Sequence, residues 1–162
     1  MSRRTSASEA ALEAQLQRFV EAARERFGAE AVFLFGSRAR GEALEDSDCD
    51  LLVVADRFAG RTWLERIQWL LDLWWELPFS GDRRPPAEPF GFTPAEVLAL
   101  DRPLVWEALG GGRVLFDAGI ARRARALYER ARSEGLLKAT ERGWSFDLDA
   151  LRKLSAGETG RT

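Results

Sequence analysis

The sequence contains no histidine and only one cysteine among its 162 residues. Without imidazole, Ser-His-Asp triads, Cys-His dyads and histidine-containing zinc sites are excluded. The single cysteine, Cys49, cannot form a disulfide within the chain, so a reducing cytoplasm is the expected location. Any chemistry must therefore depend on carboxylates, hydroxyls and guanidinium groups.

The sequence also lacks a long apolar run and an excess of charge of one sign. No stretch resembles a signal peptide or a membrane span, so we expect no membrane association. The 24 basic and 26 acidic residues give a net charge of -2, which provides no global field to attract nucleic acid. A nucleic-acid partner is therefore disfavoured, and any nucleotide must be held by local contacts.

The length and the 46% content of hydrophobic residues suit one compact domain with a small appendage. Apolar residues at steps of three or four predict a helix ending near Phe27 and another over 63–77. Short apolar runs predict buried strands over 31–35 and 48–55. A third strand is expected over 87–92, although Pro89 restricts it to an edge or irregular position.

The second half of the chain continues this alternation of helices and strands. The segment Thr93-Pro94-Ala95-Glu96 is a strong helix start, with threonine as the cap and proline at the first helical position. A short helix over 104–109, a strand over 114–116 and an arginine-rich helix over 121–132 follow. Apolar residues between 136 and 154 are interpreted as a small helical cap.

These elements predict an α/β (α+β) fold, a small mixed β-sheet flanked by helices. The expected organisation is a domain over 1–118 that includes the N-terminal helix, a helical extension over 119–155, and a disordered tail over 156–162.

Two aspartates introduce the second predicted strand. Side chains two residues apart on a strand point to the same face, so Asp48 and Asp50 would present their carboxylates side by side. Such a pair is costly unless a cation neutralises it. Hard oxygen ligands favour Mg²⁺, which completes its shell with waters and substrate phosphates. The pair therefore predicts a metal ion that accompanies a nucleotide.

A glycine-serine pair follows the first predicted strand. Gly36 would let backbone amides approach a phosphate closely, and the Ser37 hydroxyl adds a donor. Arg38 and Arg40 follow at once, and guanidinium suits bidentate contact with phosphate oxygens, although both could equally be solvated loop charges. We therefore predict Gly36, Ser37, Arg38 and Arg40 as nucleotide-binding residues.

The pattern Gly-Ser-x-Ala-Arg-Gly, a short gap and Ser-Asp-x-Asp-Leu resembles the signature of the minimal nucleotidyltransferases of the DNA polymerase beta superfamily. The resemblance covers roughly residues 31 to 116. It implies that Gly36-Ser37 binds the triphosphate and that Asp48 and Asp50 bind two divalent metal ions. It also implies a third carboxylate on a neighbouring strand. Glu88 takes that position, five residues before Thr93, where relatives most often have aspartate.

The resemblance implies transfer of a nucleoside monophosphate, expected to be AMP, from a nucleoside triphosphate such as ATP to a hydroxyl acceptor, with release of pyrophosphate. Two Mg²⁺ ions would be needed. Glu88 would hold the metal on the acceptor side and accept the hydroxyl proton. The acceptor could be a partner protein, and the resemblance implies a HEPN-type helical partner in a toxin-antitoxin pair.

Two alternatives stay open at this stage. One is a catalytically weak or inactive protein that binds a HEPN-type partner as an antitoxin. The other is an aminoglycoside-type nucleotidyltransferase for small molecules, which usually needs a larger acceptor domain than the residues after the core provide. The reach of Glu88 towards the aspartates separates the first alternative from an enzyme.

Overall fold

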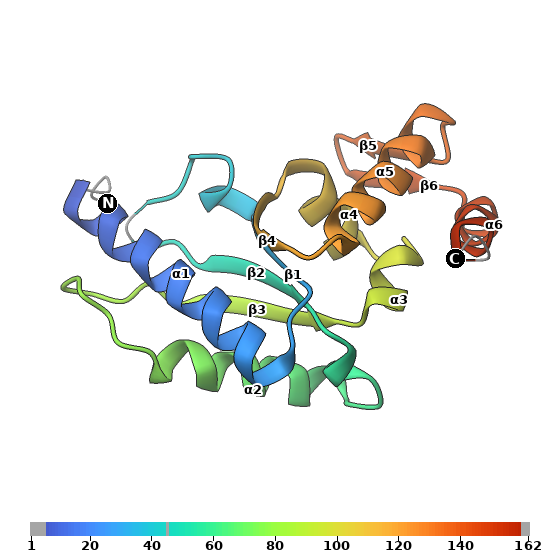
Figure 1. Ribbon diagram of the computed structural model, residues 1–162. Coiled ribbons are helices and arrows are strands. Elements are labelled where there is room, and N and C mark those ends of the chain that lie inside the picture. Colours follow the sequence, from blue (N-terminus) through green and yellow to red (C-terminus); the bar gives the residue numbers. More distant parts are fainter. Residues whose placement is uncertain (1–5, 45, 160–162) are drawn as a thin grey trace.

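A four-stranded mixed sheet lies at the centre of the molecule (Figure 1). The computed structural model describes residues 6–44 and 46–159. Along the sheet the strand order is β3-β2-β1-β4, where β1 pairs antiparallel with β2 and β4, and β2 pairs parallel with β3. The strands are β1 (Ala31–Phe35), β2 (Cys49–Val54), β3 (Ala87–Phe92) and β4 (Arg113–Asp117). The predicted mixed sheet is confirmed, and β3 is an edge strand, as Pro89 indicated.

Helices cover both faces of this sheet. They are α1 (Ser6–Phe27), α2 (Trp63–Glu76), α3 (Pro94–Leu98), α4 (Pro103–Gly111), α5 (Ile120–Ser133) and α6 (Leu148–Thr159). Two short 3-10 turns, η1 (Gly36–Arg38) and η2 (Asp56–Phe58), follow β1 and β2. In the described residues, no helix is both long and apolar enough to cross a lipid bilayer.

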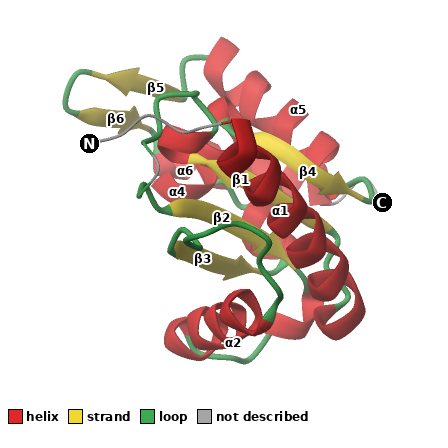
Figure 2. Ribbon diagram, turned by 90° about the vertical axis from the view of Figure 1, so that its left-hand side faces the viewer, coloured by secondary structure: helices red, strands yellow, loops and turns green. Residues whose placement is uncertain are grey.

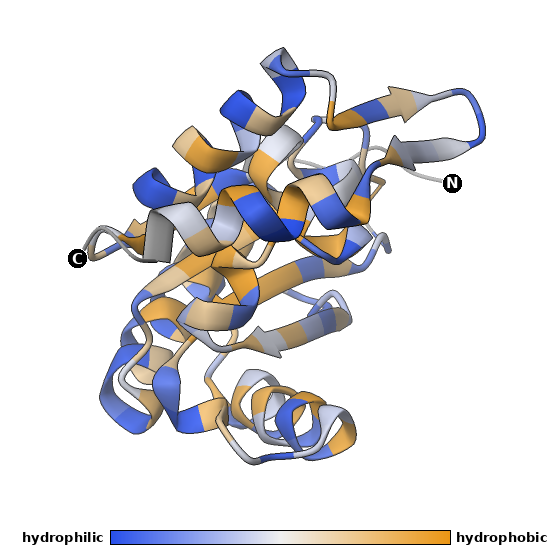
Figure 3. Cartoon of the chain, turned by 90° about the vertical axis from the view of Figure 1, so that its right-hand side faces the viewer, coloured by the Kyte–Doolittle hydropathy of each residue, from blue (hydrophilic) through white to orange (hydrophobic). Residues whose placement is uncertain are grey.

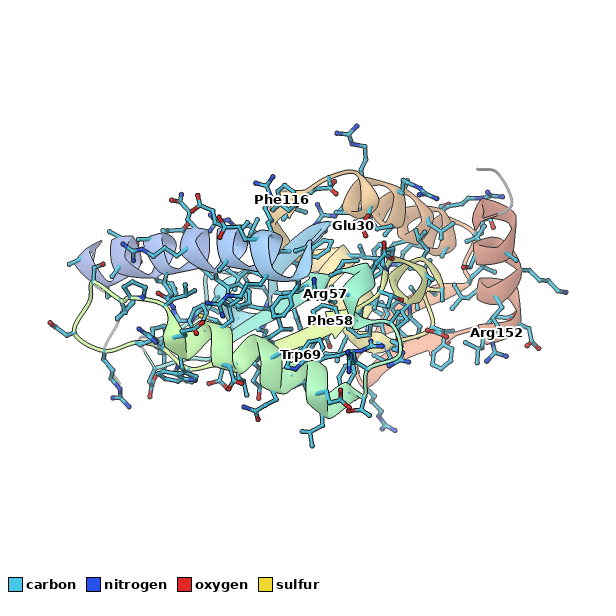
Figure 4. All side chains as sticks on the ribbon, turned by 60° about the horizontal axis from the view of Figure 1, so that its bottom comes forward. Glu30, Arg57, Phe58, Trp69, Phe116 and Arg152 are labelled. Atoms are coloured by element: carbon cyan, nitrogen blue, oxygen red, sulfur yellow. The ribbon has the colours of Figure 1, made fainter. Side chains whose placement is uncertain are left out.

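The two central strands separate two hydrophobic cores. Side chains alternate along a strand, so Phe33 and Leu52 pack towards α3, α4 and α5, while Leu34 and Leu51 pack towards α1 and α2. Figure 3 shows hydrophobic residues concentrated along the strands and on the inner sides of the helices. On the second face Phe27 stacks on Trp69, with ring centroids 6.0 Å apart, and its ring also contacts that of Phe58. Figure 4 shows Phe58 and Trp69 close to each other on this side of the molecule. The sheet is therefore buried on both sides, which fixes the positions of its strand ends.

The segment interpreted as a purely helical extension is different in the structure. Residues Leu137–Thr140 (β5) and Gly143–Phe146 (β6) form an antiparallel hairpin before α6. Trp144 and Phe146, two residues apart, both pack against Trp106, at centroid distances of 5.4 and 5.1 Å. Side chains two residues apart share a face only on a strand, so the interpretation of the apolar residues in this segment as helical is wrong for β5 and β6.

The predicted extension packs into a core of the preceding domain. Leu137 and Leu151, beyond the predicted boundary at residue 118, belong to the same buried cluster as Phe33. Helix α6 continues to Thr159, beyond the predicted start of the disordered tail at 156, and residues 160–162 lie outside the described chain. Figure 2 shows the hairpin projecting beyond the four-stranded sheet on the side of α4.

A buried arginine fixes α2 to the start of α3. Arg66, 7% exposed, donates hydrogen bonds to the carbonyls of Arg61 and Gly91 and to Glu96 Oε1 at 2.7 Å. Glu96 also completes the capping box with Thr93. Burial alone would raise the pKa of the Glu96 carboxyl, but hydrogen bonds from Thr93 and Arg66 lower it overall. The ion pair therefore favours the folded state most at neutral pH.

We expect Arg66→Met to destabilise the protein by about 3 kcal/mol, because it removes the guanidinium that pairs with the Glu96 carboxylate and donates to the Gly91 carbonyl. Arg61→Met is the control: its ion pair with Glu65 is exposed, so the loss should stay below about 1 kcal/mol. Urea unfolding measures both. Since the Glu96 pKa is lowered on folding, the difference between wild type and Arg66→Met should shrink as the pH falls through that pKa. Equal losses for both variants would contradict the assignment.

Candidate active site

An acidic pair spans the two parallel strands. Asp50 on β2 and Glu88 on β3 are register partners, so their side chains point to the same face of the sheet. Their carboxyl groups share a side-chain hydrogen bond. Asp50 is half-buried, whereas Glu88 is exposed at the outer strand. The sheet thus brings together two of the three predicted acids, although they are 38 residues apart in sequence.

The surroundings of Asp50 make its charge unfavourable. Burial is the largest of the effects that together raise the pKa of Asp50 to about 6, and the others are the hydrogen bond to Glu88 and the negative charges of Glu88, Asp48 and Glu107. Two carboxyl groups that share a hydrogen bond must share a proton or attract a cation. The pair therefore favours binding of a positive ion at neutral pH.

The turn after β1 lies directly against this acidic pair. Gly36 has φ +73°, and a Cβ atom placed on it would lie 2.1 Å from Asp50 Oδ2. Both the backbone conformation and the contact exclude larger side chains at this position. Ser37, half-exposed, follows in η1. Glycine is thus required for the turn to reach the carboxylate.

Asp48 lies directly before β2, where its exposed side chain adds to the negative potential at Asp50. Arg38 fixes the preceding residue: it is 6% exposed, and its guanidinium donates to the Ser47 carbonyl through Nε at 2.9 Å and Nη2 at 2.5 Å. Arg38 does not line the cavity of Asp50 and lines another one, beside Phe79. Its hydrogen bonds to the Ser47 carbonyl suit a role in positioning the loop that carries Asp48.

A cavity of about 560 Å³ opens beside Asp50. Gly36, Ser37, Arg40 and Asp50 line one part of it. Arg40 pairs with Glu42 at 3.0 Å, but both side chains are more than half exposed, so this ion pair is weak. Its guanidinium is thus available for exchange to a phosphate oxygen. The volume falls in the range of small-molecule sites.

Five further residues of this cavity were missed from the sequence. They belong to α4 and to the β5–β6 hairpin and are Glu107, Gly111, Ala139, Gly143 and Trp144. The only available signal was the Trp-x-Phe spacing of Trp144 and Phe146, which is typical of a strand. Their approach to the glycine-serine turn depends on long-range packing.

The donors that the site offers a Mg²⁺ ion are a pair of carboxylates. In the described residues, no group of three or more His, Cys, Asp or Glu side chains is arranged to hold a metal. Asp50 and Glu88 still form a pair of hard oxygen donors. Because Mg²⁺ is usually bound by one or two carboxylates together with substrate phosphates, the pair fits an ion that arrives with its nucleotide.

Comparison with known proteins agrees with this geometry. Residues 16–87 match the family of nucleotidyltransferase domains, a stretch that contains Gly36, Ser37, Asp48 and Asp50 and ends one residue before Glu88. Residues 16–87 are a nucleotidyltransferase domain. The resemblance to the DNA polymerase beta superfamily inferred from the signature is thereby confirmed. In this nucleotidyltransferase domain, the turn and the aspartates occupy the end of β1 and the start of β2.

Solved structures also resemble the chain, whereas no curated protein matches it. A protein of Sulfolobus solfataricus designated a nucleotidyltransferase shares 19% identity over 70% of this chain and 90% of its own, with a TM-score of 0.46. A toxin-antitoxin structure with AMP-PNP shares 16% identity over 74% and 90%, with a TM-score of 0.47. A mutant of the toxin-antitoxin MntA-HpeT shares 13% over 74% and 90%, with a TM-score of 0.45. Likeness at this level carries no information on substrate or partner.

Proposed function

We propose that this protein transfers a nucleoside monophosphate, AMP from ATP, to a hydroxyl group of an acceptor. The observation that carries the proposal is the contact between the Gly36 turn and Asp50, beside the register partner Glu88. A small-residue turn next to an acidic pair suits a triphosphate that brings its own cation. The assignment of residues 16–87 to a nucleotidyltransferase domain supports the same reaction class.

In the proposed reaction, the acceptor oxygen forms a bond to the α-phosphorus while the bond from this phosphorus to the bridging oxygen breaks. Pyrophosphate leaves with the electrons of that bond. Glu88, exposed at the outer strand, accepts the acceptor's hydroxyl proton. Ser37 and Arg40, which line the cavity together with Asp50, orient the phosphates.

Asp50 and Glu88, with Asp48, are the proposed Mg²⁺ ligands. When bound, two such ions would stabilise the developing charge on the entering and leaving oxygens. Arg38 is proposed to act on the nucleotide only indirectly, by holding the Ser47 carbonyl and hence the residue before Asp48.

A partner protein is the proposed acceptor, and a HEPN-type helical protein in a toxin-antitoxin pair is the specific candidate. A second function is favoured by one observation: the described residues contain no three-acid metal cluster. That absence suits a protein that binds such a partner without modifying it. The two functions differ in whether AMP becomes covalently attached to the partner protein.

The test is incubation with ATP labelled at the α-phosphate and Mg²⁺, with and without a HEPN-type protein encoded by a neighbouring gene. An aminoglycoside is added in a separate reaction. Mass spectrometry should detect AMP on the partner protein with wild type and no more than background with Asp48→Ala/Asp50→Ala. Asp46→Ala, which removes an exposed acid from the same loop, should retain activity.

Each outcome separates the alternatives. Labelling that persists in the double variant would reject the proposed site. Stable binding of the partner without any label would favour the non-catalytic function. A label found only on the aminoglycoside would replace the protein acceptor by a small molecule.

A further inference from the structure

The β5–β6 hairpin contributes one wall of the proposed nucleotide cavity. Ala139 from β5 and Gly143 and Trp144 from β6 line the cavity that also contains Ser37 and Asp50. Ala139 and Trp144 are cross-strand partners, so the wall is one side of a single hairpin. All three residues lie beyond residues 16–87, the part of the chain that matches the nucleotidyltransferase domain.

The segments of the chain that line the cavity contribute side chains of different chemistry. The β1 turn, its following loop and β2 contribute a glycine, a hydroxyl, a guanidinium and a carboxylate, which suit phosphates and a cation. The hairpin contributes no charged side chain and one aromatic ring, and α4 adds Gly111 and Glu107. A nucleoside triphosphate has the same division between an anionic tail and a neutral aromatic base.

We propose that Trp144 stacks on the base of the bound nucleotide, an inference that rests on the proposed function. Base stacking on aromatic side chains is favourable for every base, because each base has a π-face. The cavity lining from the hairpin therefore binds the part of the nucleotide that the phosphate-binding turn does not contact.

The position of Trp144 is fixed before any ligand arrives. Its ring packs edge-on against Trp106, at 5.4 Å and 62°. Trp106 is buried, and its Nε1 donates to the Leu100 carbonyl at 2.7 Å. A half-buried ring supported in this way loses little conformational entropy on binding.

Two glycines keep the cavity open next to this ring. A Cβ atom placed on Gly111 or on Gly143 would meet no heavy atom within 4 Å. Gly111 ends α4, while Gly143 has φ +130° and closes the hairpin turn. A bulky residue at Gly111 would therefore enter the cavity without disturbing the backbone.

The test compares two probes, ATP and inorganic tripolyphosphate, each with Mg²⁺, by isothermal titration calorimetry on the full chain. Tripolyphosphate retains the anionic tail and lacks the base. Trp144→Ala should weaken ATP binding about 5- to 100-fold and leave tripolyphosphate binding unchanged. Trp144→Phe, which retains a ring, should bind ATP within a few-fold of wild type, and Gly111→Leu should weaken ATP selectively.

Phe146→Ala is the matched control. Phe146 lies on the same strand and packs on the same Trp106, but it is not part of the cavity lining. Loss of packing alone would affect Phe146→Ala and Trp144→Ala alike. The proposal predicts normal ATP binding for Phe146→Ala.

Failure of this inference differs from failure of the proposed function. If wild type binds both probes and Trp144→Ala weakens both equally or neither, the stacking role is wrong while the phosphate and metal site stands. If wild type binds neither probe, the proposed function is wrong and the stacking role with it. Selective loss of ATP in Trp144→Ala and Gly111→Leu supports both.

Discussion

Gly36→Ala is expected to reduce nucleotidyl transfer by about 100-fold or more, because a displacement of about 1 Å at a reacting group can cost that factor. The new Cβ would lie 2.1 Å from Asp50 Oδ2 and 3.1 Å from its Cγ, so either the carboxylate or the turn must move. Labelled AMP transfer measures the loss, and circular dichroism verifies the fold.

Gly41→Ala separates this contact from backbone strain. Gly41 has the same φ of +73°, but a Cβ there meets no heavy atom within 4 Å. Both alanine variants should lose about 1 kcal/mol of stability from the left-handed conformation. Only Gly36→Ala should lose transfer, and a similar loss of activity in both variants would show that the contact with Asp50 is irrelevant.

Asp50→Asn is expected to abolish transfer while stabilising the metal-free protein at pH 8. The activity loss should be on the order of 10³-fold, since a proposed metal ligand is removed. Burial, followed by the hydrogen bond and charge of Glu88, raises the pKa of Asp50 to about 6 on folding. Ionisation of this carboxyl therefore opposes folding, and asparagine removes that opposition.

The sign of the pH dependence follows from the raised pKa. Between about pH 4 and pH 6 the folded protein binds more protons at Asp50 than the unfolded chain, so wild-type stability should fall across this window as pH rises. The decrease in wild-type stability should amount to about 1 kcal/mol once solvent screening is considered, and Asp50→Asn should not show it. Thermal unfolding without Mg²⁺ measures it. Added Mg²⁺ together with ATP should stabilise wild type at pH 8 more than the variant, and an identical response of both proteins would exclude Asp50 as a ligand.

Local patterns predicted the strands of the sheet and the start of α3 well. Ala31–Phe35 and the Thr93 capping box depend on neighbours in sequence, and both were confirmed. Pro89 correctly indicated an edge strand, because a residue without a backbone N–H is confined to such positions. Asp50 and Glu88 were predicted to meet, but only the parallel register of their strands explains how.

Other features could not be predicted from local patterns because they depend on long-range packing. Arg66 was missed as a core residue of α2, since burial of a charge depends on Glu96 and on carbonyls far along the chain. Trp144 was assigned to a helix because its apolar neighbours suit either period. Arg38 was predicted from residue type alone, which cannot distinguish a phosphate ligand from a donor to the Ser47 carbonyl.

The position of Glu88 on β3 determines from which side a proposed acceptor can approach. As the outermost strand, β3 has sheet neighbours on one side only, and Glu88 is exposed there. If Glu88 accepts the proton as proposed, a hydroxyl carried by a bulky macromolecule can reach it directly from solvent. Pro89, next to it, has no backbone N–H for an incoming β-strand, and the Gly91 carbonyl is already bound by Arg66, so strand addition at this edge is disfavoured.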